Sequence, residues 1–383
     1  MSRETKRFWM AVFALVGTII GVGIFGVPYA VSKLGVLPAI IFFVVLEGIQ
    51  LMQQLFYAEA AMVCPDKMRL PGLVGRYVGK KQRRVVAVAN VCGLWASLMA
   101  YIIVGGQFLF LLFGHSLGGQ LYQYQMIWAA VGAFVVFFGL EFVSRMSFLT
   151  VSALIVALTL IFLRAMPSIR VTNFALVDIK DMLLPYGIIF FSLGGLPIIP
   201  EMEDILEGKH RLFRRSIIVG SLMAMVLTAA FGFIVYGVTG AATTDDAVTG
   251  LQTVLGDGIA ALTAMAGFLA IMNCFFNIGT NLRNTFAYDY RLGRVSSWLL
   301  AMAVPFILYL IGPSSFVSVI SFSSAVFGGI TAVMVAWLYL VIRRQPIDER
   351  PLGVPRTLVY VEMVVLLSAA GLQLAKSVGL IGR

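Results

Sequence analysis

Eleven apolar segments, each about as long as a bilayer is thick, dominate this sequence. A membrane-spanning helix needs roughly 20 apolar residues, and this chain of 383 residues is 60% hydrophobic and only 12% charged. A soluble domain carries roughly twice that charged fraction. We therefore predict an all-α integral membrane protein with one transmembrane domain over residues 1–383. The predicted spans are roughly 9–30, 37–63, 85–113, 125–142, 147–165, 182–201, 215–239, 258–281, 296–312, 315–342 and 357–378.

The basic residues that give the chain its net charge of +10 are distributed according to the predicted topology. With the N-terminus placed in the cytoplasm, 22 of the 28 Lys and Arg residues fall on the cytoplasmic side and 6 on the other. This is a strong positive-inside bias. We expect a multi-pass protein of the plasma (inner) membrane with its N-terminus inside and its C-terminus outside. The basic side faces anionic lipid headgroups in this interpretation, and no nucleic-acid partner is expected.

The first span contains the glycine-rich stretch GTIIGVGIFG, residues 17–26, which Pro28 follows. Glycine and proline weaken or break a helix. Freed backbone groups at membrane depth are tolerated only where they face protein or a water-filled cavity. The stretch therefore indicates a broken helix that could hold a small polar solute, and close packing against a neighbouring helix is the alternative.

The sixth span is interrupted in the same way, by the stretch SLGGLP at residues 192–197. Spans one to five (9–165) and six to ten (182–342) form two blocks of nearly equal length. An odd number of spans in each block makes the second block inverted relative to the first. Interrupted helices at matching positions of two inverted halves indicate the binding site of a transporter. The eleventh span (357–378) lies outside this repeat.

Three stretches resemble a known family. Residues 17–30, GTIIGVGIFGVPYA, resemble the first-helix signature of the amino acid–polyamine–organocation superfamily. Residues 192–217 and 277–294 resemble the helix-six region and the end of helix eight in aromatic and hydroxy amino acid permeases and in amino acid/auxin permeases. The resemblance covers nearly the whole chain. It implies the five-plus-five inverted-repeat fold of bacterial leucine transporters, with broken helices one and six, and secondary transport of an amino acid by alternating access.

The resemblance also implies a substrate site made largely of backbone at the two breaks. The N-terminus of a half-helix offers N–H groups to a carboxylate, and carbonyls at a half-helix C-terminus accept from an ammonium. Apolar flanking residues favour a neutral aromatic or hydrophobic amino acid. Tyr101 would form one wall, with core packing as its alternative role. The predicted substrate-binding residues are Thr18, Gly21, Val22, Gly23, Tyr101, Phe191, Ser192, Gly194 and Gly195.

The candidates for binding a coupling ion are Glu47, Asn273, Asn277 and Thr280. Glu47 lies deep in the second span, either as a protonatable carboxyl coupled to transport or as an interhelical hydrogen-bonding group. Sodium-coupled relatives place an adjacent Thr/Ser pair on helix eight, which this chain lacks. Some proton-coupled relatives place a lysine on helix five, which is also missing. The pattern favours proton symport or uncoupled exchange over sodium coupling and leaves the ion open.

Two further polar clusters have a functional and a structural interpretation. The acidic residues after the sixth span precede basic residues 209–215 and form either an ion-pair gate or a solvated turn. The serines of the tenth span line the permeation path or allow close helix packing. These residues are Glu201, Glu203, Asp204 and Glu207, and Ser318, Ser321, Ser323 and Ser324.

Enzyme chemistry has no support in the sequence. The histidines His115 and His210 lie in predicted loops on opposite sides, and the three cysteines are scattered. We therefore expect no metal site, cofactor or enzymatic activity. Two alternatives to an amino acid transporter stay open: an amino acid sensor or channel on the same fold, and a transporter of another small solute such as a nucleobase. The particular amino acid and the oligomeric state also stay open.

Overall fold

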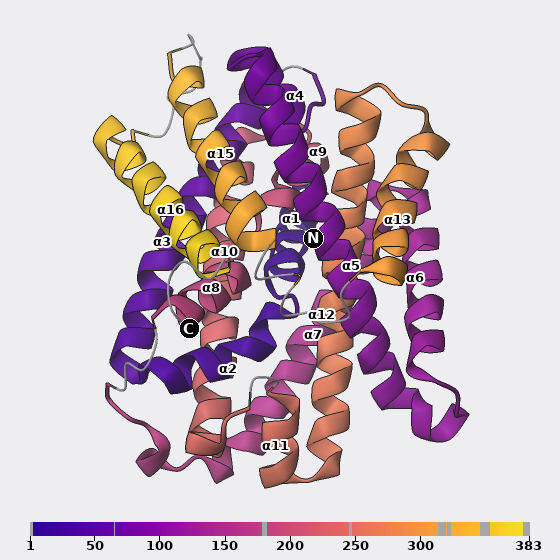
Figure 1. Ribbon diagram of the computed structural model, residues 1–383, viewed down its shortest axis with the longest axis vertical. Helices are drawn as coiled ribbons and strands as arrows, with labels where there is room; N and C mark the ends of the chain where they lie inside the picture. Colours follow the sequence, from indigo (N-terminus) through magenta and orange to yellow (C-terminus); the bar gives the residue numbers. More distant parts are fainter. Residues whose placement is uncertain are drawn as a thin grey trace.

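The structure, a computed structural model, describes residues 3–64, 66–177, 182–244, 247–312, 319, 323–344 and 353–377. These residues form an all-helical bundle (Figure 1). The α-helices are α1 (Arg3–Ile19), α2 (Gly23–Leu34), α3 (Val36–Val63), α4 (Leu70–Tyr77), α5 (Lys80–Leu117), α6 (Leu121–Phe138), α7 (Leu140–Ala165), α8 (Leu183–Ser192), α9 (Ile199–Leu206), α10 (His210–Thr239), α11 (Val248–Leu255), α12 (Asp257–Asn284), α13 (Arg294–Ile311), α15 (Gly329–Ile342) and α16 (Arg356–Ser377). The short segments are η1 (Met166–Ser168), η2 (Val171–Asn173), η3 (Leu196–Ile198), η4 (Gly240–Ala242), η5 (Thr285–Asp289) and η6 (Ser324–Gly328).

Within the described residues, eight helices are long and apolar enough to cross a bilayer, or nine if the bent pair α1–α2 forms one span. They correspond to the first nine predicted spans. The tenth is described continuously only from residue 323, through η6 and α15, and Ser318 and Ser321 lie outside the described residues. The eleventh corresponds to α16, a helix of 22 residues. The total of eleven spans stays a prediction.

Figure 1 shows α4 and α9 at one end of the bundle and α11 at the other, which we call the α4 end and the α11 end. Helices α5, α6 and α13 form one flank, and α3, α15 and α16 form the other. Between them, α12 packs against α1, α5 and α7. Because every residue of α1 from Ala11 to Ile19 except Phe13 is buried, this part of the first predicted span lies in the interior of the protein.

The first break separates α1 from α2 at residues 20–22, and the two helix axes are bent by 58°. A Cβ on Gly21 would lie 2.7 Å from the sulfur of Cys274, and one on Gly23 would lie 2.6 Å from Oγ of Ser192. Real Cβ atoms do not approach other atoms so closely. Glycine is therefore required here because neighbouring helices touch the backbone, in addition to its effect on helix propensity.

The second break follows α8, which ends at Ser192, and precedes η3 and α9. The N–H of Gly194 turns back to donate to the carbonyl of Phe191 at 3.1 Å. Helical structure resumes at η3. Pro197 occupies an N-terminal position of η3, where its missing N–H would have no partner within the helix. Helices α2 and α8 pack against each other, so the two breaks lie together although they are about 170 residues apart in the sequence.

Two contacts attach the C-terminal helices to α3. The amide nitrogen of Gln53 donates to the carboxyl of Glu362 on α16 at 2.9 Å, and both side chains are buried. The ring of Phe56 stacks on Tyr339 of α15 with centroids 4.1 Å apart. Polar groups inside a membrane protein bind each other because lipid offers them no hydrogen-bond partner. The hydrogen bond between Gln53 and Glu362 therefore stabilises the packing of α16 against α3.

Helices α5 and α6 approach closely at two glycines. The indole nitrogen of Trp128 donates to the carbonyl of Tyr101 at 3.1 Å. A Cβ on Gly105 would lie 2.3 Å from that nitrogen, and one on Gly106 would lie 2.5 Å from the backbone Cα of Gln125. Small residues at such places let two helix backbones pack directly.

We predict that Gly106→Val lowers the thermal stability of the purified protein in detergent, by about 1–3 kcal/mol, because the two backbones must separate. The matched control is Gly48→Val on α3, where an added Cβ meets nothing within 4 Å. Its melting temperature should equal that of the unaltered protein. Equal melting temperatures for the two variants would contradict the role of this contact.

Candidate substrate site and the ion-pair network beside it

The two breaks border one cavity of about 180 Å³. Five of the nine residues predicted to bind substrate line it. The first break contributes Thr18 and Gly21, the second contributes Phe191 and Gly194, and Tyr101 of α5 faces them. Backbone from both breaks therefore reaches the same space, next to an aromatic side chain.

The other four predicted residues lie outside the cavity lining. Gly23 packs against Ser192, so these two residues form the contact between the breaks. The hydroxyl of Ser192 donates to the carbonyl of Ile188 at 2.7 Å within α8. Val22 is buried. Gly195 lies against α1 and against Gln54, whose amide nitrogen would be 3.2 Å from an added Cβ.

Helices α3 and α5 supply lining residues that were not among the predicted substrate ligands. The amide nitrogen of Gln50 on α3 donates to the carbonyl of Phe190 at 2.9 Å, and Gln50 itself lines the cavity. Its side chain thereby satisfies a carbonyl freed by the end of α8. On α5, Asn90 and Ser97 also border the cavity. The lining continues to Leu70 at the start of α4, so the cavity extends from the breaks toward the α4 end.

Aromatic rings cover the breaks on the side of the α11 end. The ring of Phe25 lies 5.4 Å from Phe108 and 5.6 Å from Phe231, measured between centroids. The carbonyl of Phe25 accepts a hydrogen bond from the backbone N–H of Ala247, just before α11, at 3.2 Å. The α11 segment is thus tied to the first break, which closes this side of the site.

The coupling-ion candidates of α12 lie beside α1 rather than in the cavity lining. The amide nitrogen of Asn277 donates to Oγ1 of Thr18 at 2.8 Å. The amide oxygen of Asn273 accepts from the hydroxyl of Thr150 on α7 at 2.6 Å. Thr280 is fully buried, and its hydroxyl has no hydrogen-bond partner within the described part of the chain.

Glu47 is 3% exposed in the middle of α3. One carboxyl oxygen accepts a hydrogen bond from the hydroxyl of Ser221 on α10 at 2.7 Å. The other oxygen has no partner among the described residues. Glu362 on α16 is similar, with one oxygen bound to Gln53 and the other without a described partner. Both carboxyls therefore sit inside the protein with a neutral hydrogen-bond donor as their recorded contact.

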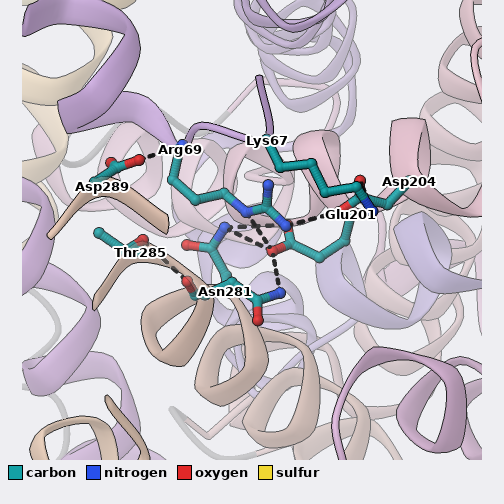
Figure 2. A network of polar contacts seen from close by, with 8 residues as sticks. Lys67, Arg69, Glu201, Asp204, Asn281, Thr285 and Asp289 are labelled. Atoms are coloured by element: carbon teal, nitrogen blue, oxygen red, sulfur yellow. Dashed lines mark hydrogen bonds and ion pairs between the residues drawn. The ribbon is translucent and has the colours of Figure 1, made fainter. Parts of the chain in front are cut away.

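A buried ion-pair network lies at the α4 end (Figure 2). Its centre is Arg69, the residue before α4, whose side chain is 2% exposed. The guanidinium donates to Glu201 at 2.9 Å and to Asp204 at 2.9 Å, both on α9. Asn281 and Asn284 of α12 also donate to Glu201. Three separate parts of the chain thus meet at one carboxylate.

The same segment is held from the other side by Asp289 at the end of η5. Its carboxylate accepts the backbone N–H groups of Arg69 and Gly72 at 2.8 and 2.7 Å. These are N–H groups at the start of α4, where a carboxylate is favoured. Burial disfavours the charged form of Arg69, but Glu201 and Asp204 outweigh it and raise its pKa above the usual value. Asp204 likewise raises the pKa of Lys67, which lies 3.2 Å away.

The acidic residues after the second break therefore pair mainly with residues far away in the sequence. Glu201 and Asp204 bind Arg69, and Glu207 binds Arg7 near the N-terminus. Lys209, a member of the basic stretch expected to pair with this cluster, binds Glu4 instead. These contacts tie α1 and the segment before α4 to the junction of α9 and α10.

Sequence reasoning missed two residues of these arrangements. Arg69 counted only as one of seven basic residues in a loop, because its partner Glu201 is 132 residues away. Cys274 counted as an isolated cysteine, yet its thiol donates toward the carbonyls of Gly17 and Thr18 at 3.4 and 3.2 Å. Its position between Asn273 and Asn277 was the available signal.

We predict that Arg69→Gln destabilises the protein by about 3–5 kcal/mol, because it leaves Glu201 buried without its cation. The double variant Arg69→Gln, Glu201→Gln should recover part of the loss, since both charges are then removed. Lys67→Gln is the control: this side chain is 63% exposed, so its loss should cost about 0–1 kcal/mol. Thermal unfolding in detergent measures all three. Similar losses for Arg69→Gln and Lys67→Gln would contradict a central role for Arg69.

Comparison with known proteins places this arrangement in a family. The model of the tryptophan/tyrosine permease family matches residues 4–371. The chain is 22% identical over 347 residues to tyrosine-specific transport system 1 of Haemophilus influenzae, which covers 86% of each chain. Its fold is similar to that of MhsT in complex with L-phenylalanine, with a TM-score of 0.69 and 13% identity over 94% of this chain and 98% of that one.

A second similar fold is that of Mhp1, a nucleobase-cation-symport-1 family transporter in a closed conformation with bromovinylhydantoin bound. The TM-score is 0.66, with 14% identity over 95% of this chain and 90% of that one. At these identities the two structures establish the fold alone. Together with the apolar helices, the family match makes this chain a multi-pass membrane transporter rather than an enzyme. The chain belongs to the tryptophan/tyrosine permease family.

Proposed function

We propose that this protein is a secondary transporter of a neutral amino acid with an aromatic or hydrophobic side chain, working by alternating access. One observation carries the proposal: backbone from two broken helices meets at one cavity, and no residue of the described lining is charged. A zwitterion needs one positive and one negative partner, and helix ends provide both without buried side-chain charges.

The ends of the four half-helices set how the substrate binds. Helices α2 and α9 begin near the cavity, and their first N–H groups favour the carboxylate. Helices α1 and α8 end there, and carbonyls of the breaks that follow them, such as that of Ile20, which has no recorded donor within the described residues, favour the ammonium. The lining residues at these ends are Ile19 and Gly21 at the first break and Phe191, Gly194 and Pro197 at the second. Val22, Gly23, Ser192 and Gly195 support the geometry of the breaks.

Aromatic lining favours an aromatic substrate. Tyr101, Phe190, Phe191 and Phe327 border the cavity, and ring pairs contribute about 0.5–1.5 kcal/mol beyond burial of their area. Two similar proteins agree with this choice, because one is a tyrosine-specific transport system and the other was solved in complex with L-phenylalanine.

The proposed architecture has eleven spans, with inverted repeats at 9–165 and 182–342 and an additional helix at 357–378. We place the α4 end in the cytoplasm of a cell with this protein in its plasma (inner) membrane, because the basic residues gather there. The N-terminus is then cytoplasmic and the C-terminus outside. In this state the Phe25 cluster closes the site toward the outside, and transport requires that the contacts on the two sides break alternately.

Glu47 is the proposed proton-binding group. It is buried in the half of the bundle that contains both breaks, and its recorded contact is the neutral hydroxyl of Ser221. A carboxyl in this setting is stable when protonated and costly when charged. Gln50, one turn along α3, connects this part of the helix to the second break.

A nucleobase-like solute is the second candidate, because one transporter of similar fold was solved with a hydantoin bound. A flat, neutral ring would also suit the aromatic lining. The two candidates differ in charge, since a nucleobase has no carboxylate or ammonium for the helix ends. Competition by amino acids against competition by nucleobases therefore separates them.

We predict that the protein, reconstituted in liposomes, takes up or exchanges aromatic amino acids, and that Gly194→Leu abolishes binding by filling the cavity at the second break. Gly187→Leu is the matched control on α8, where an added Cβ meets nothing within 4 Å. It should keep binding within about twofold of the unaltered protein. Radiolabelled uptake and thermal stabilisation by ligand measure the two effects.

A screen in which none of the twenty amino acids gives uptake, exchange or stabilisation would defeat the proposed function. Stabilisation by nucleobases alone would instead support the second candidate, a transporter of a nucleobase-like solute. Equal binding by the Gly194→Leu and Gly187→Leu variants would show that the second break is not part of the substrate site.

We predict that Glu47→Gln abolishes accumulation driven by an imposed pH gradient while retaining exchange of substrate across the membrane. Loss of the titratable group removes the coupled proton, but the neutral amide keeps the contact with Ser221. Glu362→Gln is the matched control, since Glu362 has the same pairing pattern but lies between α3 and α16. Accumulation that persists in Glu47→Gln, or disappears equally in both variants, would contradict coupling through Glu47.

A further inference from the structure

The C-terminal end of α1 raises a particular electrostatic problem. The helix ends at Ile19 inside the bundle, so its last carbonyls lack partners in the helix and carry the negative end of the dipole. Within a membrane, such groups must find a partner in the protein, in water or in an ion. In secondary transporters, a half-helix C-terminus is a place where a coupling cation binds.

Here all four of these carbonyls have partners from the protein. The carbonyl of Val16 accepts the N–H of Ile20, and that of Ile19 accepts the N–H of Gly21, both at 2.8 Å. The thiol of Cys274 points at the remaining two, 3.4 Å from the carbonyl of Gly17 and 3.2 Å from that of Thr18. Each of these four carbonyls thus has a donor of the protein beside it, with the single thiol proton shared between Gly17 and Thr18, whereas the carbonyl of Ile20 in the break itself has no recorded donor among the described residues.

A second donor from α12 faces the last full turn of α1, between Ala14 and Thr18. The amide nitrogen of Asn277 lies 2.8 Å from Oγ1 of Thr18 and 3.3 Å from the carbonyl of Ala14. The hydroxyl of Thr18 itself donates to that carbonyl at 2.8 Å. Each oxygen of α1 near this surface therefore meets an N–H, O–H or S–H group.

The orientation of the two α12 amides follows from their partners. The nitrogen of Asn277 must face α1, because a carbonyl can only accept, and its oxygen receives the hydroxyl of Ser147 at 3.3 Å. The nitrogen of Asn273 is bound to the carbonyl of Leu269 at 2.9 Å, and its oxygen receives Thr150. Both amide oxygens thus point to α7. A hard cation needs oxygen ligands, and α12 turns none of these toward α1.

We infer that hydrogen-bond donors of α12, the Cys274 thiol and the Asn277 amide, hold the end of α1 in place of a sodium ion. The inference rests on the proposed function and deepens it, because it excludes this position as a sodium-coupling site. It also explains Gly21: the thiol reaches the two carbonyls only because residue 21 has no Cβ, which would lie 2.7 Å from the sulfur.

We call the contacts of Cys274 and Asn277 with the end of α1 the clamp. The clamp lies next to the substrate cavity. Tyr101, which lines the cavity, lies beside this contact: a Cβ on Gly21 would be 3.7 Å from its hydroxyl and 2.7 Å from the sulfur of Cys274. A substrate that contacts Tyr101 can therefore change how firmly α12 holds α1. These groups are neutral, so the effect works without the binding or release of an ion at this place.

The test measures the melting temperature of the purified full-length protein, without substrate, in increasing NaCl against choline chloride at constant ionic strength. We expect no saturable stabilisation specific to Na⁺ in the unaltered protein. Asn277→Asp exchanges the donor for a carboxylate facing Thr18 and Ala14, and we expect it to gain a saturable, Na⁺-specific rise of several degrees. Asn273→Asp, one turn away with its polar atoms directed at α7 and α12, is the control and should gain none.

Saturable stabilisation of the unaltered protein by millimolar Na⁺ would overturn the inference. So would a folded Asn277→Asp variant, monodisperse in detergent, that gains no response to Na⁺. Uptake of an aromatic amino acid in Na⁺ and in choline should agree within twofold. Failure of uptake in both media would count against the proposed function, while an absent Na⁺ response of the melting temperature would still support the clamp.

Discussion

The structure depends on one constraint: a backbone N–H or C=O group inside a membrane must have a partner. Two broken helices expose such groups near the centre of the bundle, and side chains from other helices satisfy them. Cys274 and Asn277 do so at the end of α1, and Gln50 does so at the end of α8. The helices that carry these side chains are thereby held in place, so the partners of the breaks determine how α3 and α12 pack.

The positions of the charged side chains follow from the same constraint. The cavity lining in the described chain has no charged residue, whereas Arg69, Glu201, Asp204 and Asp289 meet at the α4 end. A buried ion pair recovers its desolvation cost only with good geometry and further hydrogen bonds, and here two asparagines of α12 provide them. Such a network is stable when all members are present and costly when one is withdrawn. It therefore favours one discrete arrangement of α4, α9 and α12 over a range of intermediate ones.

Helix α3 connects these features. Its buried polar residues contact α10 through Glu47, α8 through Gln50 and α16 through Gln53. Polar groups in this environment need a partner, so each of them fixes one neighbouring helix relative to α3. The helix is thus polar along the faces that meet the bundle and apolar where residues such as Val44 are exposed. The same helix supplies one lining residue of the cavity, Gln50, and the proposed proton-binding carboxyl of Glu47.

The sequence by itself determined the membrane class and the eight or nine described helices that are long and apolar enough to cross a bilayer, and it indicated where α1–α2 and α8–α9 are interrupted, because apolar length, glycine and proline act locally. It also identified residues that reach the cavity from both breaks, among them Thr18 and Gly194. Only the tertiary structure decided which polar groups meet. Arg69 binds a carboxylate 132 residues away, and the thiol of Cys274 contacts the carbonyl of Thr18, 256 residues away. The sequence states which groups need partners, and the packing of distant helices selects them.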